Sequence, residues 1–301
     1  MPVSDSVISA IGDLQLRSKS SQRVSIDERV RLCRQCLNGL AGVIDEWIQA
    51  GAQVKQCPND VSVLAEELLS GPAVIARQLQ LTMQTLRGIE SGPNPRLPGT
   101  VRRLKNGQLA VPVFPTSGFF DSLTFSGLHG IVRMQMGVAE NEVHGRKVDI
   151  ARAGNLSGIT AVLGAGNVSS IPVTDCLNKI MFEGRQVVLK VSPVNQHLGE
   201  LIAKAFAPIL QAGLLRIIQG GAEVGHELIH HPGIEDVHVT GSVATHDSLV
   251  WGTNPEDRLQ RKESNDPFLK KPVTSELGNV TPWIIFPGRY SQRELDSQAQ
   301  H

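Results

Sequence analysis

Four small residues between an apolar run and a helical pattern form the first candidate for chemistry. Residues 164–167, with the sequence Gly-Ala-Gly-Asn, follow the apolar run 159–163 and precede a helical pattern that begins at Ser169. Small residues let a backbone approach a ligand, and a helix N-terminus behind them favours a phosphate group. The sequence therefore predicts a ligand-binding turn. An ordinary strand-to-helix turn, in which Asn167 or Ser169 caps the helix, stays open as the alternative.

Other reactive side chains fit structural roles better. Cys33 and Cys36 lie within one helical pattern and have no second ligand pair, so a redox or zinc site is not expected. His230 and His231 stand at an expected helix end, where imidazoles favour the helix dipole. Cys176 lies on an apolar stretch of helix and is expected in the core. No metal site is predicted.

From residue 159 onward, apolar strand-like runs alternate with helical patterns. Right-handed crossovers between parallel strands place helices on both faces of a sheet. The predicted fold class is therefore α/β, a doubly wound and mostly parallel Rossmann-like sheet, which binds ligands at the carboxyl ends of its strands. We expect strands at 159–163, 187–191, 214–218, 237–239 and 283–286, and helices at 169–182, 198–210, 224–230 and 243–251.

The residues before this sheet are expected to form a helical segment and a β-hairpin. Ser25 precedes an acidic first turn and a long amphipathic helix that extends to Trp47, and a second helical pattern covers about 61–89. Asn106-Gly107 between two strand-like runs predicts a hairpin, followed by irregular or extended chain to about 155. We therefore divide the chain into an N-terminal helical and hairpin segment, 1–155, and an α/β domain, 156–301.

Composition and charge exclude several classes of partner. Lys plus Arg and Asp plus Glu each number 29, and no basic stripe is present, so nucleic acid is not an expected partner. No apolar run approaches the roughly 18 to 20 residues that cross a bilayer, so no membrane association is expected. Four scattered cysteines fit a reducing, cytoplasmic location. The highly charged stretch 254–267 is expected to form an exposed loop.

An ordered series of short motifs between Gly164 and Pro287 resembles the cofactor-binding half of the aldehyde dehydrogenase superfamily. Single motifs of this kind recur by chance, whereas the ordered series over about 120 residues is hard to obtain that way. The resemblance extends more weakly to residues 26–29 and leaves the first 25 residues unmatched. The motifs are Gly166-Asn167, Val188-Leu189-Lys190 with Ser192, Gly221 to Gly225 leading to His231-Pro232, Val239-Thr240-Gly241-Ser242, and Glu276-Leu277-Gly278.

The resemblance implies a role for each matched residue. In the family a cysteine thiolate adds to an aldehyde, NAD or NADP accepts a hydride, and a glutamate-activated water hydrolyses the thioester. Asn167 matches the asparagine that holds the oxyanion, and Glu276 matches the glutamate. Lys190 would hydrogen-bond the adenosine ribose, Ser242 would contact the pyrophosphate, and Gly225 would leave room beside the adenine. The other implied cofactor contacts are Gly166, Ser192, Gly241, Leu277 and Gly278.

Each implied role has a simpler alternative. Lys190 at a strand end could equally be a solvated cation. Ser242 could be a helix cap, and Glu276 could be an exposed carboxylate on a strand edge. Only the ordered set of motifs favours the family roles. The chain also departs from the family pattern, since a family glutamate that binds ribose hydroxyls falls at Pro193. The choice between NAD and NADP therefore stays open.

The reactive cysteine of the family has no match in this chain. All four cysteines precede residue 177, so none follows Glu276, where the family places its nucleophile. We expect a truncated member that binds better than it catalyses. The sequence leaves three functions as alternatives. The first is an NAD(P)-dependent oxidoreductase for aldehydes, and the second is the cofactor half of a CoA-acylating acyl-CoA reductase. The third is a catalytically silent nucleotide-binding or assembly module. A full-length member would act on a small aldehyde or acyl substrate as a homo-oligomer, and the isolated chain is expected to be poorly soluble.

Overall fold

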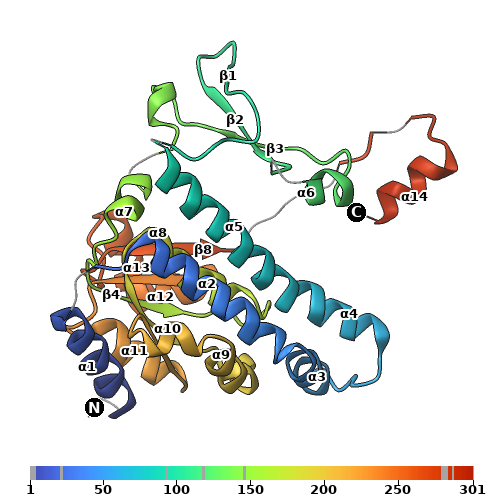
Figure 1. The fold of residues 1–301 in the computed structure, drawn as a ribbon. Coiled ribbons are helices and arrows are strands. Elements are labelled where there is room, and N and C mark those ends of the chain that lie inside the picture. Colours follow the sequence, from blue (N-terminus) through green and yellow to red (C-terminus); the bar gives the residue numbers. More distant parts are fainter. Residues whose placement is uncertain are drawn as a thin grey trace.

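A five-stranded parallel sheet lies at the centre of the molecule (Figure 1). The computed structural model describes residues 5–20, 23–92, 94–116, 119–144, 147–278, 284–286 and 288–300. Every neighbouring pair of strands is parallel, which confirms the predicted α/β class. In the order β6-β5-β4-β7-β8, the strands are β6 (Leu215–Ile218), β5 (Gln186–Lys190), β4 (Ile159–Leu163), β7 (Asp236–Gly241) and β8 (Val273–Leu277).

Helices cover both faces of the sheet because its inner strands are apolar on both sides. Ala161 of β4 belongs to the apolar cluster under α1 and α11, and the next residue, Val162, belongs to the cluster on the other face. This alternation is the two-residue period of a strand. The second face is covered by α8, α9 and α10. These helices are α1 (Asp5–Ser20), α8 (Ile171–Phe182), α9 (Gly199–Ala205), α10 (Ala207–Gln211) and α11 (Ala222–His230), with the 3-10 turn η2 (Pro193–Leu198) before α9.

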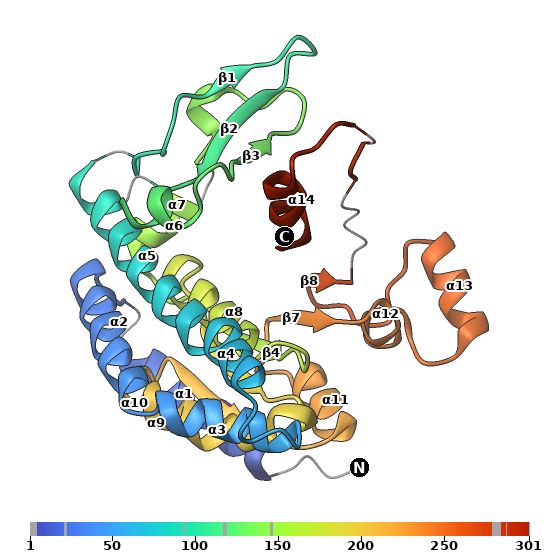
Figure 2. The same cartoon turned by 90° about the vertical axis from the view of Figure 1, so that its right-hand side faces the viewer.

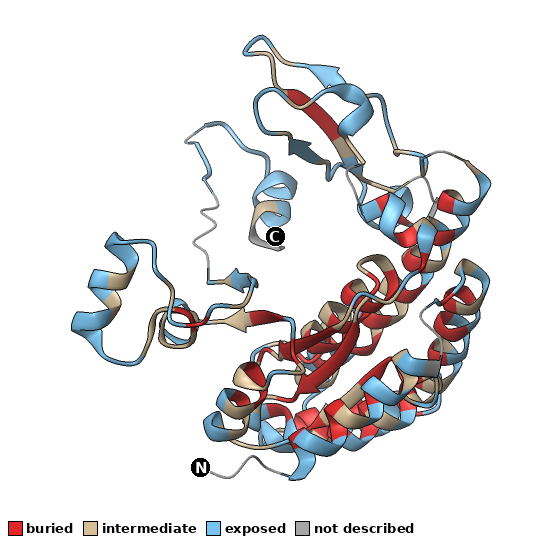
Figure 3. Ribbon diagram, turned by 90° about the vertical axis from the view of Figure 1, so that its left-hand side faces the viewer, coloured by how far each residue is buried: buried red, intermediate tan, exposed pale blue. Residues whose placement is uncertain are grey.

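The N-terminal helices pack onto the second face and share its core. Leu32, Trp47 and Ile75 belong to the same apolar cluster as Val162 and Leu189. A single cluster therefore crosses position 155 and joins the helical segment to the sheet, and Figure 3 shows buried residues on both sides of this contact. The helices are α2 (Ile26–Ala41), α3 (Ile44–Val54), α4 (Val61–Ser70) and α5 (Pro72–Ser91).

Three helices that were predicted as continuous are interrupted. The amphipathic helix begins after Ser25, which accepts a hydrogen bond from the Glu28 amide as predicted, but it ends before Val43 (φ −124°, ψ 3°). The pattern at 61–89 is divided at Gly71, where a Cβ would lie 2.7 Å from Ser169 Oγ. The helix expected at 198–210 breaks at Phe206. Apolar periodicity continues through each break, so the sequence pattern did not reveal them.

The predicted hairpin is confirmed, and a third strand extends it. Gly107 has φ 89° and its amide donates to Leu104 O over 2.9 Å, which closes the turn between β1 and β2. Strand β3 pairs with β2 in a region that was expected to be irregular or extended. Figure 2 shows this small sheet beyond the end of α5. The elements here are β1 (Arg102–Arg103), β2 (Leu109–Phe114), α6 (Phe119–Thr124), β3 (Gly130–Arg133), η1 (Glu140–Glu142) and α7 (Lys147–Ala153).

Two expectations for the C-terminal part are wrong. The fifth strand is β8, because Ile284, Ile285 and Phe286 are exposed and form no strand; Trp283 lies outside the described residues. An edge strand with little cover needs few apolar residues, so β8 gave no apolar signal. The charged stretch is exposed as predicted but is helical, forming α13 (Pro255–Glu263) after α12 (Val243–Trp251). The last helix is α14 (Gln292–Gln300), and no described helix is both long and apolar enough to cross a membrane.

Candidate functional site

The carboxyl ends of β4, β5 and β7 form the floor of one cavity. Its volume is about 350 Å³, and its walls include Lys190 at the end of β5 and Thr240 at the end of β7. Helices α11 and α12 close it from the side, through Gly225 and Leu249. Because β4 lies between β5 and β7, Lys190 and Thr240 are two strand spacings apart, or about 10 Å. This is the edge at which a doubly wound sheet binds ligands.

The turn after β4 is held in place from three sides. The Gly164 amide donates to Lys190 O over 3.1 Å, and Asn195 Nδ2 donates to Ala165 O over the same distance. Trp47 Nε1 of α3 donates to Ser169 Oγ over 3.3 Å, so the N-terminal helices also brace the turn. The helix behind it begins after Ser170, whose side chain makes no capping hydrogen bond. The turn is therefore built by distant contacts and not by a helix cap.

Lys190 is a buried cation at the wall of the cavity. Only 7% of its surface is exposed, and in the described part of the chain no hydrogen bond or ion pair is formed by its side chain. Burial lowers the pKa of Lys190, while the nearby Glu223 carboxylate acts in the opposite direction. The alternative of a solvated surface cation is therefore wrong. An unpaired buried ammonium favours an anionic or hydroxyl-rich ligand.

The two predicted glycines of the wall leave space that a side chain would fill. A Cβ on Gly166 would lie 2.9 Å from Ser192 Oγ, so these two residues, both at the cavity, are in close contact. A Cβ on Gly225 would meet only Leu163, at 3.8 Å. The packing of α11 therefore does not require a glycine at position 225, and the missing side chain leaves space in the cavity. Gly241 also lines the cavity, at the end of β7.

The other predicted site residues lie at the same edge of the sheet but do not line the cavity. Ser242 caps α12, because its hydroxyl accepts a hydrogen bond from the Thr245 amide over 3.0 Å. Glu276 and Leu277 lie on edge strand β8, opposite Thr240 and Gly241 of β7, and Glu276 is exposed. Asn167 is exposed beyond the end of β4, and Gly278 follows β8. Their roles stay predictions.

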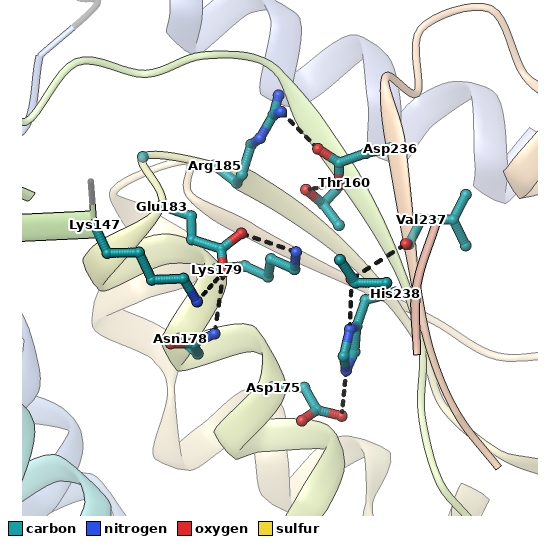
Figure 4. A network of polar contacts seen from close by, with 12 residues as sticks. Lys147, Thr160, Asp175, Asn178, Lys179, Glu183, Arg185, Asp236, Val237 and His238 are labelled. Atoms are coloured by element: carbon teal, nitrogen blue, oxygen red, sulfur yellow. Dashed lines mark hydrogen bonds and ion pairs between the residues drawn. The ribbon is translucent and has the colours of Figure 1, made fainter. Parts of the chain in front are cut away.

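A polar network next to the cavity was not predicted. On the α8 side of the sheet, Thr240 Oγ1 donates to Asp175 Oδ2 over 2.9 Å, and His238 Nε2 lies 3.4 Å from the same oxygen. His238 Nδ1 is 2.8 Å from Thr274 Oγ1 of β8. Figure 4 shows Asp175 and His238 facing each other between α8 and β7. One feature of the sequence could have revealed this network: His238 and Thr240 alternate with valines on a strand that was expected to be apolar throughout.

The sequence of the part of the chain that contains the cavity matches a known family. The sequence pattern described as "Aldehyde dehydrogenase family" matches residues 135–296, more than half of the chain. The chain belongs to the aldehyde dehydrogenase family. Human 4-trimethylaminobutyraldehyde dehydrogenase is 34% identical over 104 residues, which are 34% of this chain and 18% of that protein. N-succinylglutamate 5-semialdehyde dehydrogenase of Novosphingobium aromaticivorans is 28% identical over 148 residues, 47% of this chain and 29% of that protein.

Solved aldehyde dehydrogenase structures have the same fold. The HpcC protein of Thermus thermophilus superposes with a TM-score of 0.51 at 14% identity, covering 92% of this chain and 41% of that one. A lactaldehyde dehydrogenase gives the same TM-score and identity, with 91% and 44% covered. The chain thus spans less than half the length of these structures and about a fifth to a third of the curated relatives above.

None of the four cysteines of this family member lines the cavity. Cys33 and Cys36 are buried in α2, and burial raises the pKa of each thiol to about 12. Burial also raises the pKa of Cys176 in α8 well above its ordinary value, and Cys57 lies in the turn after α3. The predicted structural role of Cys33, Cys36 and Cys176 is thereby supported. Among the described residues, no group of three or more metal-binding side chains is present.

Proposed function

We propose that the chain binds NAD or NADP as the cofactor part of an aldehyde oxidoreductase. The observation that carries this proposal is the unpaired, buried Lys190 in a cavity at the carboxyl edge of the parallel sheet. A bound nicotinamide cofactor would supply the hydride acceptor. Lys190 would donate hydrogen bonds to ribose or phosphate oxygens, and Gly166, Ser192, Gly225 and Gly241 would shape the wall. In this proposal residues 156–301 supply the dinucleotide-binding domain and residues 1–155 brace it.

The proposed chemistry places two further residues at the rim of the cavity. The side-chain amide of Asn167 would donate a hydrogen bond to an oxyanion formed from the aldehyde, and the carboxylate of Glu276 would take a proton from water. Ser242, Leu277 and Gly278 would contact the cofactor from the same rim. Asn167 follows the carboxyl end of β4 and Glu276 is the penultimate residue of β8, so both lie at the same edge of the sheet, which supports a common location for them. A small aldehyde or acyl group is the proposed substrate, and a homo-oligomer is the proposed assembly of a full-length enzyme.

Either nicotinamide cofactor is compatible with the charge of the cavity. Lys190 is the one charged residue among the described residues that line it. No carboxylate lines the cavity itself, Glu223 is the carboxylate near Lys190, and the ammonium would attract the extra phosphate of NADP. Pro193, where the family often has a glutamate, is itself a wall residue and has no charge. The structure therefore supports testing both cofactors.

Isothermal titration calorimetry of the chain with NAD and with NADP tests the proposal. Lys190→Met removes the ammonium but keeps a long apolar stem, and the loss of a charge-assisted hydrogen bond of about 1.5–3 kcal/mol is expected to weaken binding at least tenfold. The matched control is Lys204→Met, a surface lysine of α9 that is paired with Glu46 of α3 and does not line the cavity. Absence of binding by the wild-type chain, or equal affinity of both variants, removes the cofactor assignment.

A catalytically silent binding module is the second candidate function. The observation that favours it is the position of the cysteines, because no thiol of this chain lines the cavity. We expect NAD(P) binding without aldehyde-dependent reduction of the cofactor. Formation of reduced cofactor with a panel of short aldehydes, measured by absorbance at saturating cofactor, would instead establish the chain as a dehydrogenase.

A further inference from the structure

The N-terminus of α11 opens onto the cavity on the same side of the sheet as Lys190. Val188 of β5 belongs to the apolar cluster under α1 and α11, and the two-residue period of a strand puts the Lys190 side chain on this face too. Gly221, which precedes α11, and Ala222, its first residue, both line the cavity. Because Gly221 has no side chain to cap the helix, the first amides of α11 and the Lys190 ammonium are hydrogen-bond donors at this end of the cavity.

The carboxylate of Glu223 lies against this part of the cavity wall. The Gly221 amide donates to Glu223 Oε1 over 2.9 Å, so the side chain turns back from the first turn of α11 onto Gly221. A Cβ on Gly221 would overlap Glu223 Oε2, so the carboxylate takes the space that a side chain at position 221 would need. In the described part of the chain Oε2 accepts no hydrogen bond, and it therefore stays available to a ligand.

Lys190 and Glu223 give this end of the cavity one positive and one negative charge. The Glu223 carboxylate is close enough to oppose the effect of burial on the pKa of Lys190. A ribose with two free hydroxyls can accept a hydrogen bond from the ammonium and donate one to the carboxylate. A phosphate group on that ribose can use only the ammonium, and the carboxylate repels it. The pair therefore suits a neutral diol better than a phosphate.

We propose that Glu223 is a specificity-determining residue, which accepts a hydrogen bond from a ribose hydroxyl at the Lys190 end of the cavity and disfavours a phosphate group there. The chain then binds NAD more tightly than NADP. The proposal deepens the nucleotide-binding function and rests on it. Pro193 on the cavity wall has no side chain that could accept this hydrogen bond, so α11 supplies the carboxylate with which doubly wound sheets recognise the ribose of NAD.

Titration calorimetry of the wild-type chain with NAD and with NADP measures this preference directly. Because Glu223 is exposed and solvent screens its charge, NAD is expected to bind about fivefold more tightly than NADP. Glu223→Gln keeps an oxygen that can accept from the Gly221 amide but removes the charge, and it should abolish most of this preference. The matched control is Glu200→Gln, an exposed glutamate in the first turn of α9 that does not line the cavity, and it should leave the preference unchanged.

Gly221→Ala tests the position of the carboxylate. The added methyl group must displace Glu223 Oε2, so the ratio of the two affinities should fall towards one in the wild-type background and should not change further in the Glu223→Gln background. Equal or tighter binding of NADP by the wild-type chain, or a preference for NAD that Glu223→Gln leaves unchanged, would overturn the role of Glu223 while the cofactor site stands. A wild-type chain that binds neither dinucleotide removes the proposed function and this inference together; circular dichroism of each variant checks that it is folded.

Discussion

Lys190, for which we propose a binding role, also has a cost to stability. Burial lowers the pKa of Lys190 below its ordinary value of 10.5. A lysine whose pKa is lower in the folded state destabilises the fold while it is charged, and this penalty fades as the pH rises from the folded pKa towards the unfolded one. Lys190→Met is therefore expected to raise the free energy of unfolding at pH 7 by about 1 kcal/mol, although it weakens binding.

Urea unfolding of this variant at pH 7 and pH 10 checks the sign. The advantage over the wild type should be smaller at pH 10, because more of the folded protein then carries Lys190 in its neutral form, which removes the cost of burying the charge. A variant that is less stable than the wild type at pH 7 would show that the ammonium is paired and stabilising.

A substitution at Gly225 is expected to change stability and cofactor binding in opposite directions. It lies inside α11, and the nearest atom to an added Cβ is 3.8 Å away, so alanine fits. Alanine is a better helix former than glycine by about 1 kcal/mol, and its methyl group enters the cavity. Gly225→Ala is expected to raise the melting temperature and to weaken NAD or NADP binding several-fold. Thermal unfolding and calorimetry on the same sample test both, and tighter binding would contradict the role of Gly225.

The location of a single site residue could be predicted from sequence where the residue lies within a recognisable short motif. The sequence located Lys190, Gly166 and Gly225 at a ligand-binding edge, and the cavity includes all three. It gave no sign of Asp175, because the hydrogen bond to Thr240 joins residues 65 positions apart. Ser242 shows the opposite difficulty, since the same serine fits a cofactor motif and caps a helix.

Arg29 links α2 to α7 and α8 by hydrogen bonds from its side chain. Arg29 is 2% exposed, and its guanidinium donates to Met181 O over 2.5 Å at the end of α8 and to Ala151 O of α7. Burial lowers the pKa of Arg29, and no carboxylate offsets its charge in the described contacts. Arg29→Met leaves these buried carbonyls unpaired and is expected to cost about 2–4 kcal/mol of unfolding free energy.

The matched control for Arg29 is Arg31→Met on the exposed side of the same helix. It is expected to change the unfolding free energy by less than about 0.5 kcal/mol. Equal effects of the two substitutions in urea unfolding would mean that the carbonyl contacts of Arg29 contribute nothing.

Elements with a strong apolar pattern were predictable, and those at the edge of the sheet were not. The pattern located β4 to β7 because both faces of these strands are buried. Strand β8 is paired on one side and mostly exposed, so its Thr-Ser-Glu sequence has no apolar pattern, while Ile284 to Phe286 had the composition of a buried strand and are exposed. Breaks such as Gly71 depend on contacts with Trp47 and Ser169 that no local pattern contains.

At the scale of the whole molecule, exposed apolar side chains favour self-association. Ile284 is 70% exposed, Phe286 76%, and Leu123 of α6 67%. We expect the chain to associate with rising concentration, and the double substitution Ile284→Ser with Phe286→Ser to reduce this association. Light scattering coupled to size-exclusion chromatography measures it, with Leu259→Ser on the exposed α13 as the control. A monodisperse wild-type monomer at every concentration would contradict the expectation.

The apolar cluster that crosses position 155 limits how this chain can be recombined with its relatives. A chimera joined at that position would set Leu32 and Trp47 from one parent against sheet and helix side chains from another, and their shapes would not interlock. Changes within α13 itself affect only exposed or half-buried side chains, since none of its residues is buried. Inserted segments, tags and changes of length should therefore be tolerated at α13, whereas the N-terminal helices and the sheet should be taken together from one parent.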